Sequence, residues 1–348
     1  GGRGFESLIA HHNFLIKQIN MKIKKYTNGL IIHPGLSDEI GTNIQGPSLI
    51  KTPHWLTNSL GKYYLYFADH KGDHIKMAYS DELLGPWKIY SGGTLQLSHS
   101  GFLTESPEKP TSFSTKNSTV GRLEGFNPHP EQSQYIPTRL DDMVIPHIAS
   151  PDVHVDEENN QIVMFYHGLE KFGTQSTRVA LSTDGINFKS TSKVIGHPYF
   201  RRFKYKNTYY GMAMPGLIYK NTGAIDEYTE VKSLFPNKIR HSGLFLLNNT
   251  LNVFYTLVGD IPERIYLSTI ELSDNVSNWK ESPPIEVIRP TQDWEGANLP
   301  LQHSSRSAIN IPVNQLRDPY IFKDNEDIYL LYTVKGETGI GICSIELT

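Results

Sequence analysis

A repeated group of strands constrains the fold of this chain more than any other feature. Each copy has an apolar strand, a short polar turn and an aromatic-rich strand, usually followed by a third strand. Five copies follow one another, with aromatic-rich strands that read KYYLYFADH (62–70), QIVMFYHG (161–168), TYYGMAMPG (208–216), LNVFYTLVG (251–259) and IYLLYTVKG (328–336). Five copies of a unit of three to four strands, with almost no helical periodicity, predict an all-β, five-bladed β-propeller.

The fifth copy stops after its third strand, at the end of the sequence. An open ring of sheets would leave backbone hydrogen-bonding groups unpaired along its edges. We therefore expect the lysine-rich, strand-like stretch Met21–His33 to supply the outer strand of the fifth sheet and to close the ring.

The domain organisation follows from the same repeat. Residues 1–20 lack the features of a signal peptide, so we interpret them as an extension upstream of a natural start at Met21. Residues 21–348 are predicted to form a single domain with insertions at about 91–146 and 283–312. Loops of this length are usually functional or disordered. In the absence of an export signal, we expect a cytoplasmic protein.

Composition excludes several classes of function. Lys and Arg total 33 against 36 Asp and Glu, a formal charge of -3, which argues against a general nucleic-acid binder. No apolar run is long enough to span a bilayer, so no membrane partner is expected. The single cysteine, Cys343, excludes an intrachain disulfide and a cysteine-based metal site, and its alternating apolar surroundings predict a buried thiol. The oligomeric state stays open.

Polar residues recur where the repeats bring strand ends together. In a propeller, the start of each innermost strand and the end of the next strand lie at the same mouth of the central channel. The residues at these positions are Asn43, Gln45, Asp69, His70, His147, Ser150, Asp152, His167, Arg201, Arg202, Arg240, His241, Asp260, Arg317, Asp318, Lys335 and Glu337. Such convergence is typical of a ligand site. The alternative is that these groups satisfy strand ends at a solvated rim.

Several segments resemble one known group of enzymes. GPSLI…GKYYLYFADH…IKMAYSDELLGPWKIY, SPDVHVD…MFYHG…TRVALSTDGINF and LRDPYIF…IYLLYTV look like the blades of five-bladed propeller glycoside hydrolases, the fold of families 32, 43, 62, 68, 117 and 130. The resemblance covers roughly Ile44 to Leu347. It implies three carboxylates at the starts of blades one, two and three, because glycoside cleavage needs one group to donate a proton and another to activate water or attack the sugar.

The carboxylates match this pattern only in part. Asp152, in SPDV, matches the aspartate of blade two. Blade one has Gly46 where an aspartate is expected, and blade three offers no glutamate. Asp318 opens blade five as an Asp-Pro pair, and Glu295 lies on the second insertion. We therefore take Asp152, Asp318 and Glu295 as the candidate catalytic residues.

The mouth is rich in arginine and histidine. Arginine forms bidentate hydrogen bonds to carboxylate, sulfate or phosphate groups. We therefore predict a hydrolase, most simply a glycoside hydrolase, acting on a small anionic saccharide in an axial pocket. The predicted substrate-binding residues are His70, His167, Arg201, Arg240 and Arg317.

Two other functions stay open. His70, His147 and His241 would hold a divalent metal (Zn or Ca) in a metal-dependent ester or phosphoester hydrolase, or a lyase, on the same propeller. Without a metal, a histidine would act as general acid or base. Alternatively, the protein is a sugar-binding propeller without catalytic activity.

Overall fold

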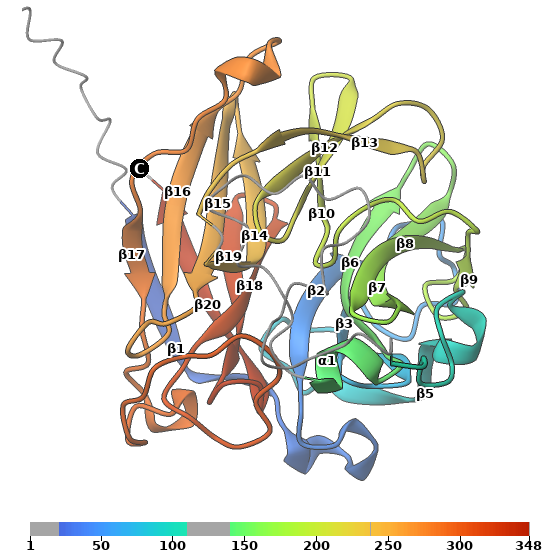
Figure 1. The fold of residues 1–348 in the computed structure, drawn as a ribbon. Coiled ribbons are helices and arrows are strands. Elements are labelled where there is room, and N and C mark those ends of the chain that lie inside the picture. Colours follow the sequence, from blue (N-terminus) through green and yellow to red (C-terminus); the bar gives the residue numbers. More distant parts are fainter. Residues whose placement is uncertain (1–20, 110–139, 237, 348) are drawn as a thin grey trace, which may run out of the picture.

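Five antiparallel sheets of four strands each surround a common centre (Figure 1). The computed structural model describes residues 21–109, 140–236 and 238–347, so the upstream extension and most of the first insertion lie outside the described residues. The first strands of neighbouring blades contact one another around the axis: β2 contacts β6 and β18, and β14 contacts β10 and β18. The all-β, five-bladed propeller predicted from the repeat is confirmed.

The blades follow the order of the repeats. Blade one has β2 (Gln45–Lys51), β3 (Tyr63–Ala68), β4 (His74–Ser80) and β5 (Lys88–Gln96). Blade two has β6 (Ile148–Asp156), β7 (Gln161–Lys171), β8 (Thr174–Ser182) and β9 (Lys189–Ser190). Blade three has β10 (Arg201–Tyr205), β11 (Thr208–Ala213), β12 (Leu217–Asn221) and β13 (Tyr228–Ser233). Blade four has β14 (Ile239–Leu247), β15 (Thr250–Leu257), β16 (Ile265–Glu271) and β17 (Ile285–Ile288).

Blade five is completed by the N-terminal strand. Its strands are β18 (Arg317–Asp324), β19 (Asp327–Val334), β20 (Gly339–Leu347) and β1 (Met21–Ile32). β1 pairs antiparallel with β20 as the outer strand, which confirms the predicted closure of the ring. Helical structure in the described residues is limited to short pieces: α1 (Leu140–Val144) and the 3₁₀ turns Pro34–Leu36, Asp38–Ile40, Leu97–His99, Val276–Asn278 and Asp293–Glu295. No helix within the described ranges is long and apolar enough to cross a membrane.

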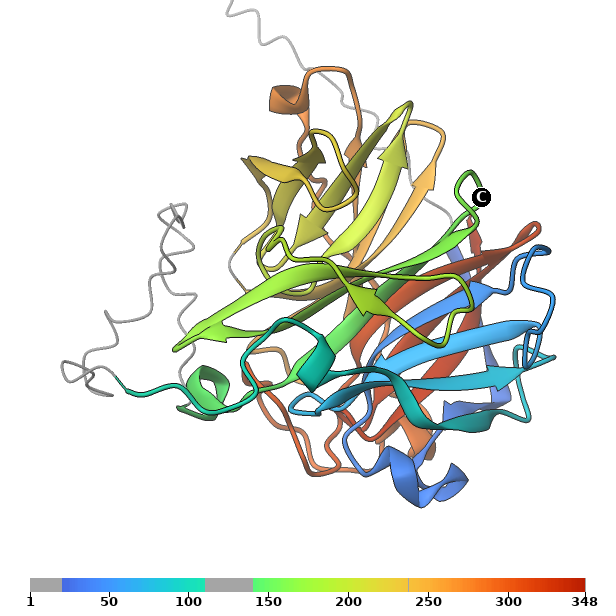
Figure 2. The same cartoon turned by 90° about the vertical axis from the view of Figure 1, so that its right-hand side faces the viewer.

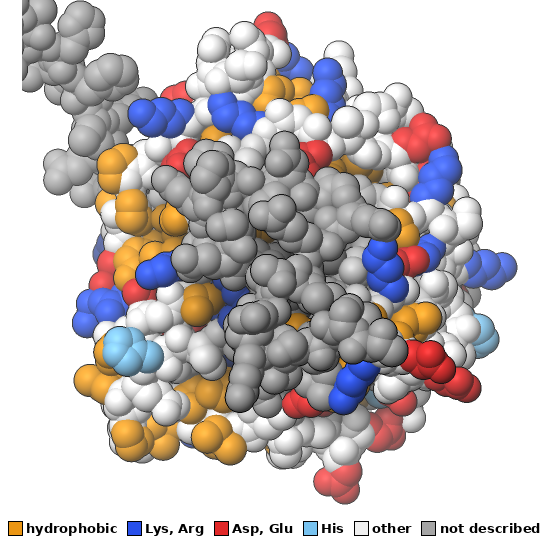
Figure 3. All heavy atoms as spheres, viewed as in Figure 1, with side chains coloured by type: hydrophobic (Ala, Val, Ile, Leu, Met, Phe, Trp, Pro, Cys, Tyr) orange, Lys and Arg blue, Asp and Glu red, His pale blue; other side chains and the backbone are white. Residues whose placement is uncertain are grey.

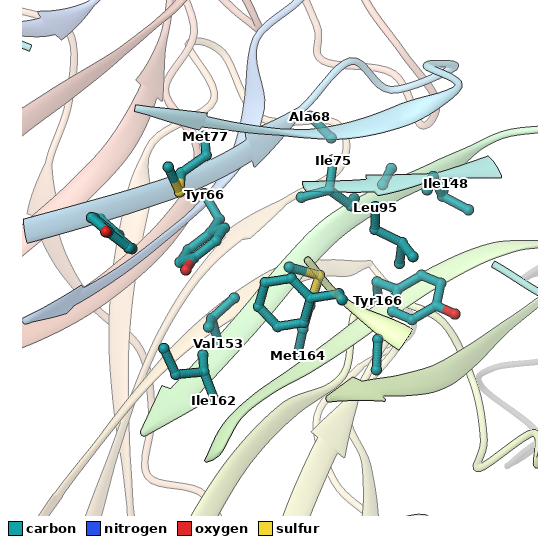
Figure 4. Close-up of a cluster of buried hydrophobic side chains, with 14 of the residues drawn as sticks. Tyr66, Ala68, Ile75, Met77, Leu95, Ile148, Val153, Ile162, Met164 and Tyr166 are labelled. Atoms are coloured by element: carbon teal, nitrogen blue, oxygen red, sulfur yellow. The ribbon is translucent and has the colours of Figure 1, made fainter. Parts of the chain in front are cut away.

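The core lies between the blades. Figure 2 shows blade one, in blue and cyan, beside blade two, in green. Between them, Tyr66 and Met77 of blade one pack against Ile162, Met164 and Tyr166 of blade two (Figure 4). Each sheet is covered on both faces, so the second strands are continuously apolar and aromatic rather than alternating. Cys343 is also buried, as predicted.

Three of the five innermost strands open with the same irregularity. Gly46, Ser150 and Asp318 each have a positive φ (64°, 48° and 48°), precede a proline, and lie at a break in the register with the second strand. The three residues meet at the axis. A Cβ on Gly46 would lie 2.7 Å from Cα of Ser150, and the amide of Gly46 donates to Oδ2 of Asp318 at 3.3 Å. We call this set the bulge ring; it holds the Asp318 carboxylate on the axis.

Candidate functional site

A buried polar cluster lies where the innermost strands begin. We call it the strand-start cluster; its members are His70, His147, His167, Tyr199, Arg240, His241, Glu263, Arg317, Asp318 and Glu337, and all are buried. They come from the starts of innermost strands, from the turns after second strands, from within β7 (His167), and from the segment before β10 (Tyr199). The repeat therefore brings residues of blades one, two, four and five to one mouth, and Tyr199 joins them from the segment before blade three.

Two carboxylate–imidazole pairs flank one tyrosine in this cluster. Oδ1 of Asp318 lies 2.5 Å from Nδ1 of His241, and Oε2 of Glu337 lies 3.2 Å from Nδ1 of His70. The Tyr199 ring stacks on His241 with 3.6 Å between centroids, and its hydroxyl lies 3.2 Å from Nε2 of His70. Tyr199 has φ 61°, a left-handed conformation that costs a non-glycine residue about 1–3 kcal/mol and that clusters at active sites.

Burial and charge set the protonation of these pairs. Burial alone would raise the pKa of Asp318, but the charge and hydrogen bond of His241 lower it below its usual value. Burial alone would likewise raise the pKa of Glu337, but His70 and Arg317 hold it well below the usual range. Burial lowers the pKa of His241, although Asp318 acts in the opposite direction. At neutral pH, His241 is therefore neutral; with its proton on Nδ1, the nitrogen that faces Asp318, the ring keeps a lone pair on Nε2.

The arginines of this mouth are already paired inside the protein. Arg317 is fully buried, with Nε 3.0 Å from Glu263 and one terminal nitrogen 2.8 Å from Glu337. Nε of Arg240 lies 3.0 Å from the second oxygen of Glu263, and its terminal nitrogen donates to the carbonyl of Ser305. Their positive charges are thus balanced by two buried glutamates.

Two further histidines carry polar atoms with no protein partner. Within the described residues, neither ring nitrogen of His167 has a hydrogen-bond partner, nor do Nε2 of His147 and Nε2 of Gln45. The rings of His147 and His167 lie 5.9 Å apart, and His167 also contacts Tyr199. Buried polar groups are nearly always satisfied, so these atoms indicate a site for ligand hydroxyl groups or water.

The buried histidines make stability depend on pH. Burial lowers the pKa of His147 to about 3 and that of His167 well below its usual value. In the unfolded chain, both take up a proton below about pH 6.5. Below that pH the unfolded state binds more protons, so each histidine is expected to remove about 1.4 kcal/mol of stability per pH unit until its folded pKa is reached.

Urea unfolding measured from pH 7 to pH 4 tests this expectation. The His147→Gln variant should lose stability less steeply than the wild type, by about 1.4 kcal/mol per pH unit below pH 6. Equal slopes would show that His147 is not held neutral in the fold.

The structure divides the predicted site residues between three places. His70, His147, His167, Arg240, His241, Arg317 and Asp318 lie together in the strand-start cluster. Asp152 and Arg201 lie past the bulge ring and pair with each other at 3.3 Å. The Asp152 carboxylate also accepts from Nε2 of His154 and the amide of Arg202, both at 2.7 Å. Arg201 in turn donates to the backbone carbonyls of Pro47, Pro151 and Ser242, so this pair ties neighbouring blades together.

Glu295 lies away from the axis. Its carboxylate binds Nζ of Lys25 on β1 at 2.7 Å and the hydroxyl of Tyr332 on β19 at 2.8 Å. It also accepts from the amides of Thr291 and Gln292. These contacts fasten the second insertion to the closing strand, which is a structural role rather than contact with the strand-start cluster.

The predicted metal site does not form in the described residues. No three or more His, Cys, Asp or Glu side chains there are placed to hold a metal ion. The nitrogens of the predicted ligands serve other partners: Nδ1 of His70 and of His241 face carboxylates, and Nδ1 of His147 lies 2.7 Å from the carbonyl of Ile145. Tyr199 contacts the rings of both His70 and His241.

Sequence reasoning missed two members of the cluster and gave a third no role. Tyr199 follows no repeat position, and Glu263 has no motif around it. Glu337 was placed at the mouth but not among the candidate site residues. A signal for both glutamates existed: each lies in the turn between the second and third strands of its blade, the position that His70 has in blade one.

Comparisons with known proteins agree with the fold. No family model matches the chain. A GH130 glycoside hydrolase that targets β-1,2-mannosidic linkages in Candida mannan has a TM-score of 0.58 at 11% identity, covering 93% of each chain. A GH43_1 enzyme from Xanthomonas citri has a TM-score of 0.52 at 11% identity, covering 92% of this chain and 91% of that one. The exo-β-1,3-galactanase from Phanerochaete chrysosporium, in its crystal structure with galactose, has a TM-score of 0.53 at 10% identity. The match covers 94% of this chain and 64% of that one.

A curated relative lies much nearer in sequence. The uncharacterized protein R118 of Acanthamoeba polyphaga mimivirus is 33% identical over 325 residues, which cover 86% of this chain and 82% of that protein. The structural likenesses confirm the resemblance to the five-bladed propellers of glycoside hydrolase families 43 and 130. By identity and coverage, the chain belongs to the family of protein R118 of Acanthamoeba polyphaga mimivirus.

Proposed function

We propose that this protein is a glycoside hydrolase whose saccharide substrate binds at the strand-start mouth. The observation that carries the proposal is the pair of carboxylate–imidazole contacts, Asp318–His241 and Glu337–His70, on either side of Tyr199. Glycoside cleavage needs one group that takes a proton and one that gives a proton. The fold shared with families 43 and 130 supports the same class of reaction.

The two pairs divide the proton transfers between them. Nε2 of neutral His241 takes a proton from a water molecule, whose oxygen bonds to the anomeric carbon. The glycosidic C–O bond breaks, and the leaving oxygen takes a proton from Nε2 of protonated His70, whose positive charge Glu337 stabilises. Asp318 keeps His241 in the correct tautomer, the role that a buried carboxylate has in a catalytic triad. A proton then moves from His241 through solvent to His70 and restores the starting state.

The surroundings favour an uncharged saccharide. The prediction of an anionic sugar came from Arg201, Arg240 and Arg317, and each of these guanidinium groups is paired with a carboxylate. Within the described part of the chain, the polar atoms here without a hydrogen-bond partner include Nε2 of His147, both ring nitrogens of His167 and Nε2 of Gln45. Neutral imidazole and amide groups match sugar hydroxyls, which both donate and accept hydrogen bonds.

Turnover of a panel of aryl glycosides and neutral oligosaccharides, with product sugars measured by chromatography, tests this function. We expect sugar release by the wild type, a loss of about 10²-fold or more in kcat/KM for His70→Gln, and no change for Tyr79→Phe on β4. Binding without release would support the sugar-binding alternative. A rate that a chelator abolishes would support the metal-dependent alternative.

A further inference from the structure

A cavity lies on the other side of the bulge ring from the strand-start cluster. All five innermost strands line it, and its volume is about 300 Å³, within the range of small-molecule sites. We call it the strand-end pocket. Its apolar wall includes Leu49, Val153, Leu244 and Phe322. The histidine pairs of the proposed hydrolase do not line it.

The charged lining of this pocket is mostly positive. Lys51, Arg201, Arg202 and Lys323 line it, against the single carboxylate of Asp152. That carboxylate is already bound by Arg201 and His154. Lys51 pairs with Asp324 at the rim, where its side chain stays 42% exposed. On the face shown in Figure 3, positive and negative side chains are interspersed.

Arg202 is the cation of this pocket whose side chain is held in place by both burial and a ring contact. It is 8% exposed, and its guanidinium lies 3.6 Å from the centre of the Tyr209 ring. Its Nε has no hydrogen-bond partner within the described residues. Stacking fixes the plane of the guanidinium through its face and leaves its edge for hydrogen bonds, the geometry with which arginine binds phosphate.

We propose that the strand-end pocket binds a small phosphorylated molecule, such as a sugar phosphate. Lys51 and Arg201 are paired with Asp324 and Asp152, so Arg202 and Lys323 remain as two positive charges without a carboxylate partner in the described residues, which a dianion balances better than a singly charged ion does. The volume exceeds the needs of phosphate alone, and the apolar wall offers a surface for the carbon skeleton. The Arg202 edge would hold the phosphate group, with Lys323 at the rim. This proposal does not depend on the hydrolase function, because the two sites share no lining residue.

Calorimetric titration of the full chain with glucose 6-phosphate, inorganic phosphate and glucose tests the proposal. We expect saturable binding of glucose 6-phosphate, weaker binding of phosphate, and no binding of glucose that depends on this pocket. The affinity for glucose 6-phosphate should fall about tenfold or more in Arg202→Gln and several-fold in Lys323→Glu, and it should weaken with added salt.

Lys220→Glu is the matched control, because Lys220 is exposed on β12 and does not line the pocket, and this substitution changes the net charge by the same amount as Lys323→Glu. Its affinity should equal that of the wild type. Lys323 is exposed, so its variant keeps the test valid if Arg202→Gln fails to fold. No saturable binding of glucose 6-phosphate, equal affinity in Lys323→Glu and the wild type, or glucose binding as tight as that of its phosphate would each overturn the proposal.

Discussion

Asparagine in place of Asp318 is expected to lower kcat/KM for saccharide cleavage by about 10³-fold, within the usual range for acid–base groups, while the fold survives. An amide can donate to Nδ1 of His241 and hold the ring in the tautomer with Nε2 protonated, which cannot take a proton from water. Asparagine tolerates the left-handed backbone at φ 48°, so the bulge ring can keep its shape. Steady-state kinetics together with circular dichroism measure both parts of the expectation.

Two other carboxylates provide controls for this substitution. Asp327→Asn changes an exposed side chain at the start of β19 and should leave kcat/KM unchanged. Glu295→Gln removes the charge that binds Lys25 and should lower stability while the folded protein keeps its activity. Unchanged activity in Asp318→Asn would remove the Asp318–His241 pair from the mechanism.

The largest effect on stability is expected for Arg317→Met. Arg317 is fully buried between Glu263 and Glu337, so its removal leaves two buried carboxylates short of a partner. Breaking a buried ion pair from one side costs about 3–5 kcal/mol. Urea unfolding at pH 7 should show a loss of free energy of unfolding of this size.

A surface pair gives the comparison for Arg317. Arg289 is 47% exposed and pairs with Glu286, so Arg289→Met should cost less than about 1 kcal/mol. A similarly small loss in Arg317→Met would mean that the buried glutamates find other partners or become protonated.

The architecture could be predicted because its signals are local. Each blade can be recognised in the sequence by an apolar, aromatic second strand, because every sheet is packed on both faces and its second strand is buried. The closing role of Met21–Ile32 followed from the missing outer strand of blade five, and the pairing of β1 with β20 confirms it. The length of the N-terminal extension and the single-domain boundary stay predictions.

For the site, the sequence predicts only which residues occupy equivalent positions in the repeat. Phase placed His70, His241, Arg317 and Asp318 at one mouth, and the structure brings them together. Phase cannot show which side chains pair across blades. The strand register breaks just before Asp152, and the Asp152 side chain lies on the far side of the bulge ring. Glu263 balances the charges of two arginines, although the turn that holds it has no recognisable sequence motif.

Hydrolysis in water enriched in ¹⁸O, followed by mass spectrometry of the released sugar, tests the central claim most directly. Attack by water that His241 has deprotonated places one ¹⁸O on the anomeric carbon of the product, and His241→Gln should lose this labelled product in proportion to its loss of kcat. Sugar release without the label, or equal labelled product from His241→Gln and the wild type, would contradict the account.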